Sequence, residues 1–77
     1  MKPIQILDLM TQIDCTEDFV QIDRWGKQCA LLQMYAWDRK IAIHARRTGS
    51  IAAALTREAK NDHRYGVVAK LAKIEGY

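Results

Sequence analysis

Residues 44–53 have the sequence HARRTGSIAA, which marks the point where one predicted helix ends and another begins. Arg46 and Arg47 suit the last turn of a helix, because cations are stabilised by the partial negative charge at that end. Gly49 can adopt the left-handed conformation that closes many helices, and Ser50 is a favoured N-cap for the next one. The stretch therefore predicts two helices joined by a short corner.

Upstream of this corner, residues 17–47 carry two apolar stripes at helical spacing. The first stripe consists of Ile22, Trp25, Cys29, Leu32, Ala36 and Ile43, with Arg39 at the one position where the pattern lapses. The second stripe consists of Met34, Trp37, Ile41 and Ala45. Thr16 is the expected N-cap of this helix.

An unbroken helix over residues 17–47 would be about 46 Å long, whereas the radius of gyration of a compact chain of this size is about 11 to 12 Å. Two alternatives stay open: Gly26 breaks the helix, or the long helix protrudes and pairs with a second copy of the chain.

Three further segments show helical spacing. Pro3 suits a first helical position, and the residues Ile6, Leu9, Met10 and Ile13 follow it on one face. After Ser50, the expected buried face consists of Ile51, Ala54, Leu55 and Ala59. Either Asn61 or Asp62 can cap a last helix that carries Val68, Leu71 and Ile74 before Gly76. We therefore predict an all-α fold: a small bundle of three to four helices with one long central helix, in a single domain over residues 1–77.

The charges are unevenly distributed along the 77 residues, whose net charge is +3. Residues 1–38 hold three basic and six acidic side chains, a net charge of −3, whereas residues 39–77 hold nine basic and three acidic, a net charge of +6. Such a split favours a basic surface that meets an anionic partner, or complementary halves in a head-to-tail assembly. Ordinary solvated faces are the alternative interpretation.

The pattern argues against an enzyme. The four glycines are too scattered for a phosphate-binding loop, so nucleotide chemistry is not expected. No two of the four candidate zinc ligands lie close together in the sequence, as the ligands that nucleate a zinc site do; these are Cys15, Cys29, His44 and His63. We therefore expect no metal and no other cofactor. Both cysteines are expected as reduced thiols, with Cys29 packed in the core. The sequence has no signal-peptide core and no membrane-spanning segment, which favours a cytoplasmic location.

The basic residues define a candidate partner-binding patch over residues 40–64. On the predicted helices they form two stripes, which converge on an anion if the helices meet at a tight corner. The patch consists of Lys40, His44, Arg46, Arg47, Arg57, Lys60 and Arg64.

A second candidate surface is apolar and lies on the long predicted helix, which has more apolar surface than so small a chain can cover. We predict a homodimer through this helix, with Leu32, Met34, Tyr35 and Trp37 near the seam or against another partner. Trp25, on the first stripe, is expected in the core.

Two classes of anionic partner remain open for the basic patch. The first is an acidic protein surface or a nucleoprotein complex, which the modest net charge and the acidic first half favour; the second is nucleic acid, contacted at its phosphates. Asp23-Arg24-Trp25-Gly26 resembles a short stretch of phage antitermination proteins. In size and helical character the chain resembles phage-encoded regulators and inhibitors, including anti-CRISPR proteins. This resemblance of type implies a small protein that acts by binding.

Overall fold

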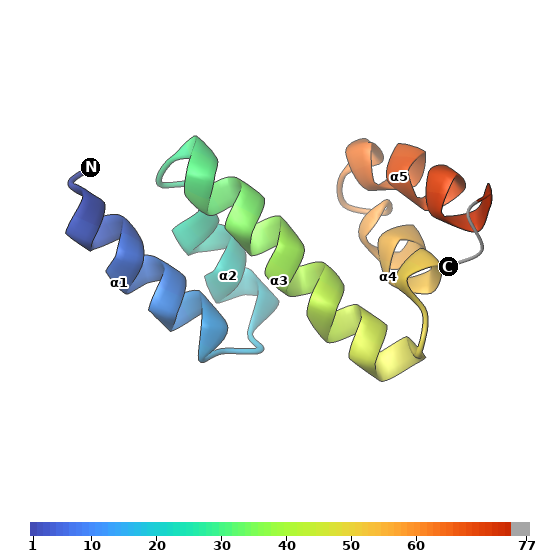
Figure 1. The fold of residues 1–77 in the computed structure, drawn as a ribbon, viewed down its shortest axis with the longest axis horizontal. Helices are drawn as coiled ribbons and strands as arrows, with labels where there is room; N and C mark the ends of the chain where they lie inside the picture. The colour runs from blue at the N-terminus through green and yellow to red at the C-terminus, as the bar shows by residue number, and fades with distance from the viewer. Residues whose placement is uncertain (75–77) are drawn as a thin grey trace. The chain divides into compact units, whose positions relative to one another are not determined.

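The computed structural model describes residues 1–74, and every regular element within them is a helix. The helices are α1 (Pro3–Asp14), α2 (Phe19–Gly26), α3 (Ala30–Thr48), α4 (Ile51–Glu58) and α5 (His63–Ile74) (Figure 1). They form two compact units, unit 1 (Met1–Lys40) and unit 2 (Ile41–Tyr77), and α3 contributes to both. The all-helical prediction is confirmed for the described residues.

The predicted long helix is broken, so the described chain has five helices where three to four were predicted. Its two parts are α2 and α3, which are separated by residues 27–29. Gly26 is the last residue of α2, so the first of the two alternatives holds. Cys29 falls in this connection and is half-buried, which corrects its expected place in the core.

The start of α2 also differs from the prediction, because Asp18 and not Thr16 caps it. The Asp18 carboxylate accepts hydrogen bonds from the backbone N–H groups of Val20 and Gln21, at 3.0 and 3.4 Å. The Thr16 hydroxyl accepts the N–H of Asp18 at 3.1 Å. Thr16 therefore shapes the turn that leads into the helix, and the carboxylate, the better acceptor, takes the cap.

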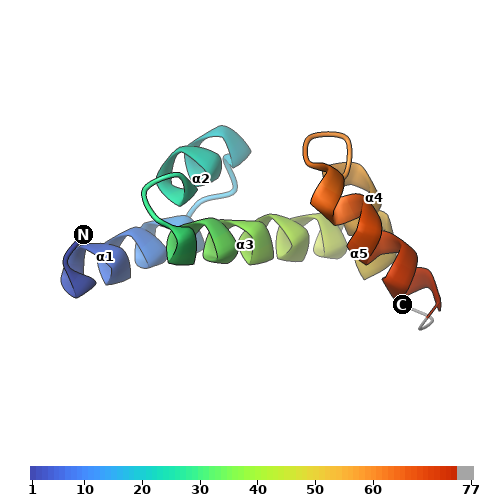
Figure 2. The same ribbon diagram turned by 90° about the horizontal axis from the view of Figure 1, so that it is seen from above.

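Unit 1 packs α2 against one side of the pair formed by α1 and α3 (Figures 1 and 2). Its core is made by Ile13, Ile22, Leu32 and Ala36, and Trp25, expected in the core, is half-buried. Gly26 lets α2 and α3 approach closely: a Cβ added there would lie 2.8 Å from the Cβ of Ala36. That contact is too short for two methyl groups, so only glycine fits.

Unit 2 contains the end of α3 and the pair α4 and α5, which lie side by side (Figure 1). The corner predicted from residues 44–53 is present: Gly49 has a φ of 74°, and the Ser50 hydroxyl accepts the N–H of Ala53 at 3.3 Å. Asp62 caps α5, since its carboxylate accepts the N–H of Arg64 at 3.0 Å. The core of unit 2 consists of Ile43, Ala52, Ala54, Leu55, Tyr65 and Ala69.

Several apolar positions of unit 2 face outward, contrary to the prediction. Ile51 is exposed, and Glu58 lies in the core near Ala54 and Leu55 in its place. Among the described side chains of α5, Tyr65 and Ala69 are buried and lie one turn apart, and the predicted inward positions Leu71 and Ile74 are exposed. Gly76, which was expected to end this helix, lies outside the described residues.

Candidate binding surface

Five of the seven basic residues of the predicted patch are exposed, and all five belong to unit 2. They come from the last turn of α3, the end of α4, the connection after α4 and the first turn of α5. We call the set the basic surface: Arg46, Arg47, Arg57, Lys60 and Arg64.

Lys40 is not on this surface, because it is buried in unit 1. Its Nζ lies 2.7 Å from the Asp23 carboxylate, an ion pair that joins α3 to α2. A buried ammonium group needs such a partner to offset its lost hydration. The predicted i, i+4 stripe from Lys40 to His44 therefore points into the protein.

His44 is likewise turned inward, toward a buried carboxylate. Its Nε2 lies 3.1 Å from Oε1 of Glu58, which is only 2% exposed. The contact ties the end of α3 to α4 within unit 2. His44 is thus a packing partner of Glu58 and adds little to the exposed positive charge.

Each of the two acidic residues described in unit 2 contacts a basic side chain of the same unit. Glu58 is buried, as stated above, and Asp62 is bound by Arg64, whose Nε donates to the carboxylate at 2.9 Å. The side-chain and backbone hydrogen bonds from Arg64 lower the pKa of Asp62 to about 2, and Asp62 raises the pKa of Arg64. Arg64 is therefore partly neutralised, and Arg46, Arg47, Arg57 and Lys60 are the other exposed cations of the basic surface.

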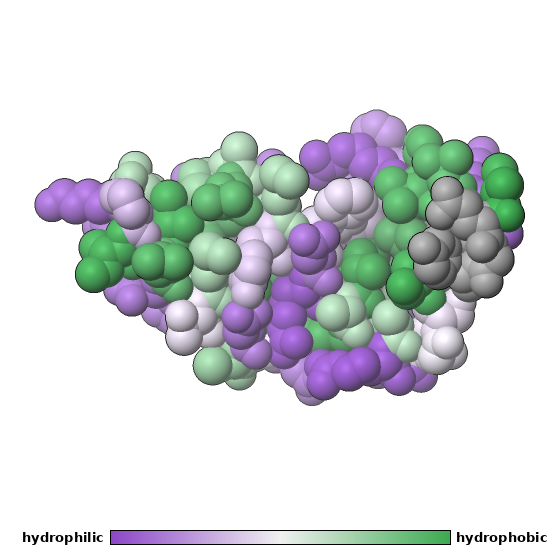
Figure 3. All heavy atoms as spheres, viewed as in Figure 1, coloured by the Kyte–Doolittle hydropathy of each residue, from purple (hydrophilic) through white to green (hydrophobic). Residues whose placement is uncertain are grey.

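The cations of the basic surface are spread over unit 2. Hydrophilic atoms cover both the end of α3 and the connection between α4 and α5 (Figure 3). Arg57 is in the last turn of α4, and Lys60 lies in the connection that follows, where its N–H donates to the Arg57 carbonyl at 3.4 Å. Such a distribution suits contact with an extended anionic surface more than the capture of one small anion.

The predicted dimer residues of unit 1 occupy different environments. Leu32 is fully buried in the core, so it is not available at a seam. Tyr35 is half-buried, and its hydroxyl donates to the Asp14 carboxylate at 2.6 Å. This hydrogen bond, together with burial, raises the pKa of Tyr35. Trp37 is half-buried and Met34 is exposed.

Two features were missed by the sequence analysis. Leu31 is 53% exposed and was not among the predicted seam residues, whereas Leu32, Ala36 and Ile43 of the first stripe are buried. Val67, Leu71 and Ile74 form an exposed apolar stripe on α5, which we call the α5 stripe. The spacing of Tyr65 and Ala69 was the signal for it, since residues four apart share a helix face.

Other kinds of site find no support in residues 1–74. No three His, Cys, Asp or Glu side chains among them gather where they could hold a metal ion, and neither cysteine is in a disulfide. None of the described helices has the length and apolarity needed to cross a membrane. In comparisons with known proteins, no family model, curated protein or solved structure matches the chain.

Proposed function

We propose that this chain is a small, non-enzymatic regulatory or inhibitory protein that docks the basic surface of unit 2 on an acidic protein or nucleoprotein complex. The observation that carries the proposal is the exposure of Arg46, Arg47, Arg57 and Lys60 while Glu58 is buried. Complementary charge speeds the encounter with a partner and disfavours cationic surfaces. In this proposal it acts in the cytoplasm, in the manner of phage-type inhibitors such as anti-CRISPR proteins.

The α5 stripe supports a protein partner over nucleic acid. Its three apolar side chains are flanked by Lys70 and Lys73, which are also exposed. An apolar strip between cations complements an acidic protein surface that has an apolar centre, whereas a phosphate backbone has no matching apolar area. Nucleic-acid binding through the same cations is the second candidate function.

The test uses two pairs of basic residues in matched positions. Arg57 and Lys60 lie at and just after the end of α4, and Arg24 and Lys27 lie at and just after the end of α2. Reversal of either pair to glutamate makes the same change of net charge. Each pair also lies at the end of a helix of eight residues, so the local setting is similar.

A partner captured from the native host and identified by mass spectrometry is then purified, and its affinity for each variant is measured by calorimetry. Arg57→Glu with Lys60→Glu should weaken binding more than tenfold, because like charges then oppose each other across the interface. Arg24→Glu with Lys27→Glu should bind as the wild type does. Equal affinities of all three proteins would refute the proposal.

A further inference from the structure

Unit 1 exposes large apolar side chains on the side of α1 and α3 that is turned away from α2. Leu31 and Met34 on α3 are 53% and 63% exposed, and Ile4 and Leu7 on α1 are exposed to a similar degree. Apolar atoms cover this part of unit 1 in Figure 3, which views it from the side opposite α2. We call these four residues the α1/α3 face. A small protein rarely leaves such a surface uncovered.

The position of Leu31 and Met34 follows from the contacts of the neighbouring positions on α3. Tyr35 and Arg39 turn toward the end of α1, where they bind Asp14 and the carbonyls of Ile13 and Thr16. Because each residue advances about 100° around a helix, Leu31 lies about 40° from Tyr35 and Met34 about 100° from it, both on the side of Tyr35 that is opposite to Arg39.

The opposite side of α3 is occupied by α2. Ala36 meets Gly26 there, and Lys40 pairs with Asp23. The α1/α3 face is therefore the side of unit 1 that neither α2 nor its connections cover.

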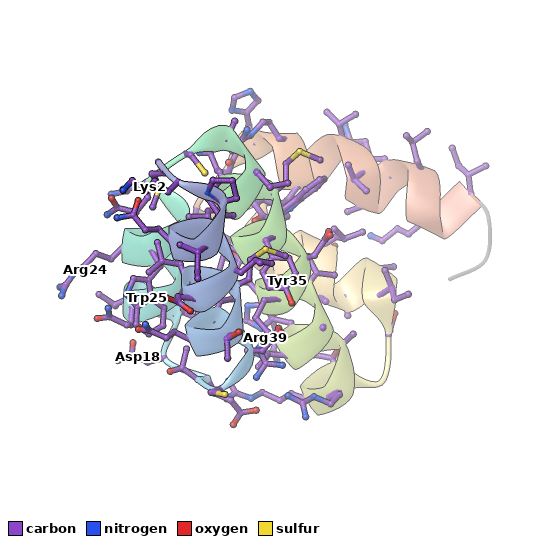
Figure 4. All side chains as sticks on the ribbon, turned by 60° about the vertical axis from the view of Figure 1, so that its left-hand side comes forward. Lys2, Asp18, Arg24, Trp25, Tyr35 and Arg39 are labelled. Atoms are coloured by element: carbon purple, nitrogen blue, oxygen red, sulfur yellow. The ribbon has the colours of Figure 1, made fainter. Side chains whose placement is uncertain are left out.

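Charge is sorted along this face from one end to the other. In unit 1, α1 and α3 run in the same direction, so their positive dipole ends lie together (Figure 1). Lys2 adds positive charge at that end, while Asp14 and the exposed Asp38 lie toward the other. Figure 4 shows Lys2 at one end of α1 and Arg39 near the other.

We infer that a second copy of this chain covers the α1/α3 face in an antiparallel arrangement about a two-fold axis. An antiparallel copy sets Lys2 of each chain near Asp38 of the other and opposes the aligned helix dipoles. A two-fold contact uses the same patch on both chains, so the patch must be self-complementary, and this one is in both charge and apolar character. The contact belongs to unit 1 and is independent of the basic surface.

The apolar part of the inference is tested with Leu31→Gln combined with Met34→Gln, measured by light scattering at tens of micromolar. The control is Val20→Gln on α2, because Val20 is 70% exposed but lies away from the face. The wild type and the control should have twice the 8.8 kDa mass of one chain, and the double variant should have the mass of one chain. Circular dichroism checks that all three proteins stay helical. A monomeric wild type, or a double variant that still dimerises, would overturn the inference.

The antiparallel direction is tested separately by exchange of charges. Each dimer contains the Lys2 and Asp38 pair twice, so Lys2→Glu or Asp38→Lys alone should raise the dimer dissociation constant about tenfold. The two changes together exchange the signs and should restore the wild-type constant. A combined variant that is as weak as the single variants would contradict the antiparallel arrangement.

Discussion

A polar residue can occupy an apolar helical stripe because it caps another helix. Arg39 interrupts the stripe that contains Leu32, Ala36 and Ile43. Its guanidinium donates to the carbonyl of Ile13 at 3.3 Å and to that of Thr16 at 3.0 Å. The last carbonyls of a helix have no partner within the helix itself. Arg39 thus joins α3 to the last turn of α1 and to the connection that follows it, within unit 1.

For a single residue, Tyr35, we expect the stability that its hydroxyl contributes to the folded state to be lost at alkaline pH. Its hydrogen bond to Asp14 favours the neutral phenol and raises the pKa above 10.0 in the folded protein. A group whose pKa is raised by folding stabilises the folded state below its unfolded pKa, and this contribution is lost as the pH rises above about 10.

Tyr35→Phe should therefore lower the free energy of unfolding by about 1 kcal/mol at pH 7. Urea unfolding of both proteins between pH 7 and pH 11 checks this. The difference in the free energy of unfolding between wild type and variant should become smaller above pH 10. A difference that stays constant would argue against the hydrogen bond between Tyr35 and Asp14.

At the scale of helix pairs, the two buried or half-buried helical glycines should respond to alanine in opposite ways. A Cβ at Gly26 would meet the Cβ of Ala36 at 2.8 Å, whereas a Cβ at Gly66 would lie at an ordinary 3.5 Å from that of Ala59. Overpacking of this kind costs about 1–3 kcal/mol, and alanine in a helix interior otherwise gains about 1 kcal/mol over glycine.

Gly26→Ala should thus destabilise the protein and Gly66→Ala should stabilise it, as measured by thermal unfolding. Adding Ala36→Gly to the first variant removes the clash and should recover part of the loss. A Gly26→Ala variant whose thermal stability equals that of the wild type would show that α2 and α3 do not approach as closely as Gly26 and Ala36 indicate.

The start of α5 should weaken in acid. The Asp62 carboxylate accepts hydrogen bonds from the guanidinium and the backbone N–H of Arg64. These bonds lower the pKa of Asp62 from 3.8 to about 2. A group whose pKa is lowered by folding stabilises the folded state above its unfolded pKa, and the contribution is lost as the pH falls through about 2.

Carbon-13 chemical shifts of α5, followed from pH 5 to pH 1.5, should show this loss in the wild type. Asp62→Asn keeps a cap that does not titrate, so the shifts of its α5 should change less over the same range. Parallel changes in both proteins would exclude Asp62 as the cause.

The elements were easier to predict from the sequence than their inward faces. Pro3, Gly49, Ser50 and Asp62 act through the local backbone, and their roles agree with the structure. The first stripe also named the buried residues Leu32, Ala36 and Ile43 of α3, but the inward direction of α5 depends on where its neighbouring helix lies. Leu71 and Ile74 were therefore expected in the core but are exposed, and Leu32, which was also expected near a seam, lies in the core.

At the scale of the whole molecule, the charge asymmetry was visible in the sequence, but the membership of the basic surface was not. Lys40 and His44 share helical spacing with Arg47, yet each faces a carboxylate distant in the sequence, Asp23 and Glu58. Spacing along one helix does not reveal a partner on another. Only the packing of the helices against one another therefore shows which of these cations are exposed and which are buried.

The nature of the partner should appear in the response of binding to salt. If Arg46, Arg47, Arg57 and Lys60 each neutralise one phosphate of duplex DNA, the logarithm of the binding constant should fall with the logarithm of salt concentration with a slope of about −3.6. A protein partner should give a shallower slope, because contacts of the α5 stripe are apolar and salt does not screen them.

Val67→Ser with Leu71→Ser supplies the matched control, since both residues are exposed and the changes leave every charge in place. These substitutions should weaken binding to an acidic protein partner several-fold and leave generic DNA binding unchanged. Binding is measured by fluorescence anisotropy from 50 to 300 mM salt, roughly the range over which phosphate contacts lose most of their affinity. A steep slope that the serine variant does not alter would favour nucleic acid. The four cations would then act on phosphates alone, and the α5 stripe would have no part in binding.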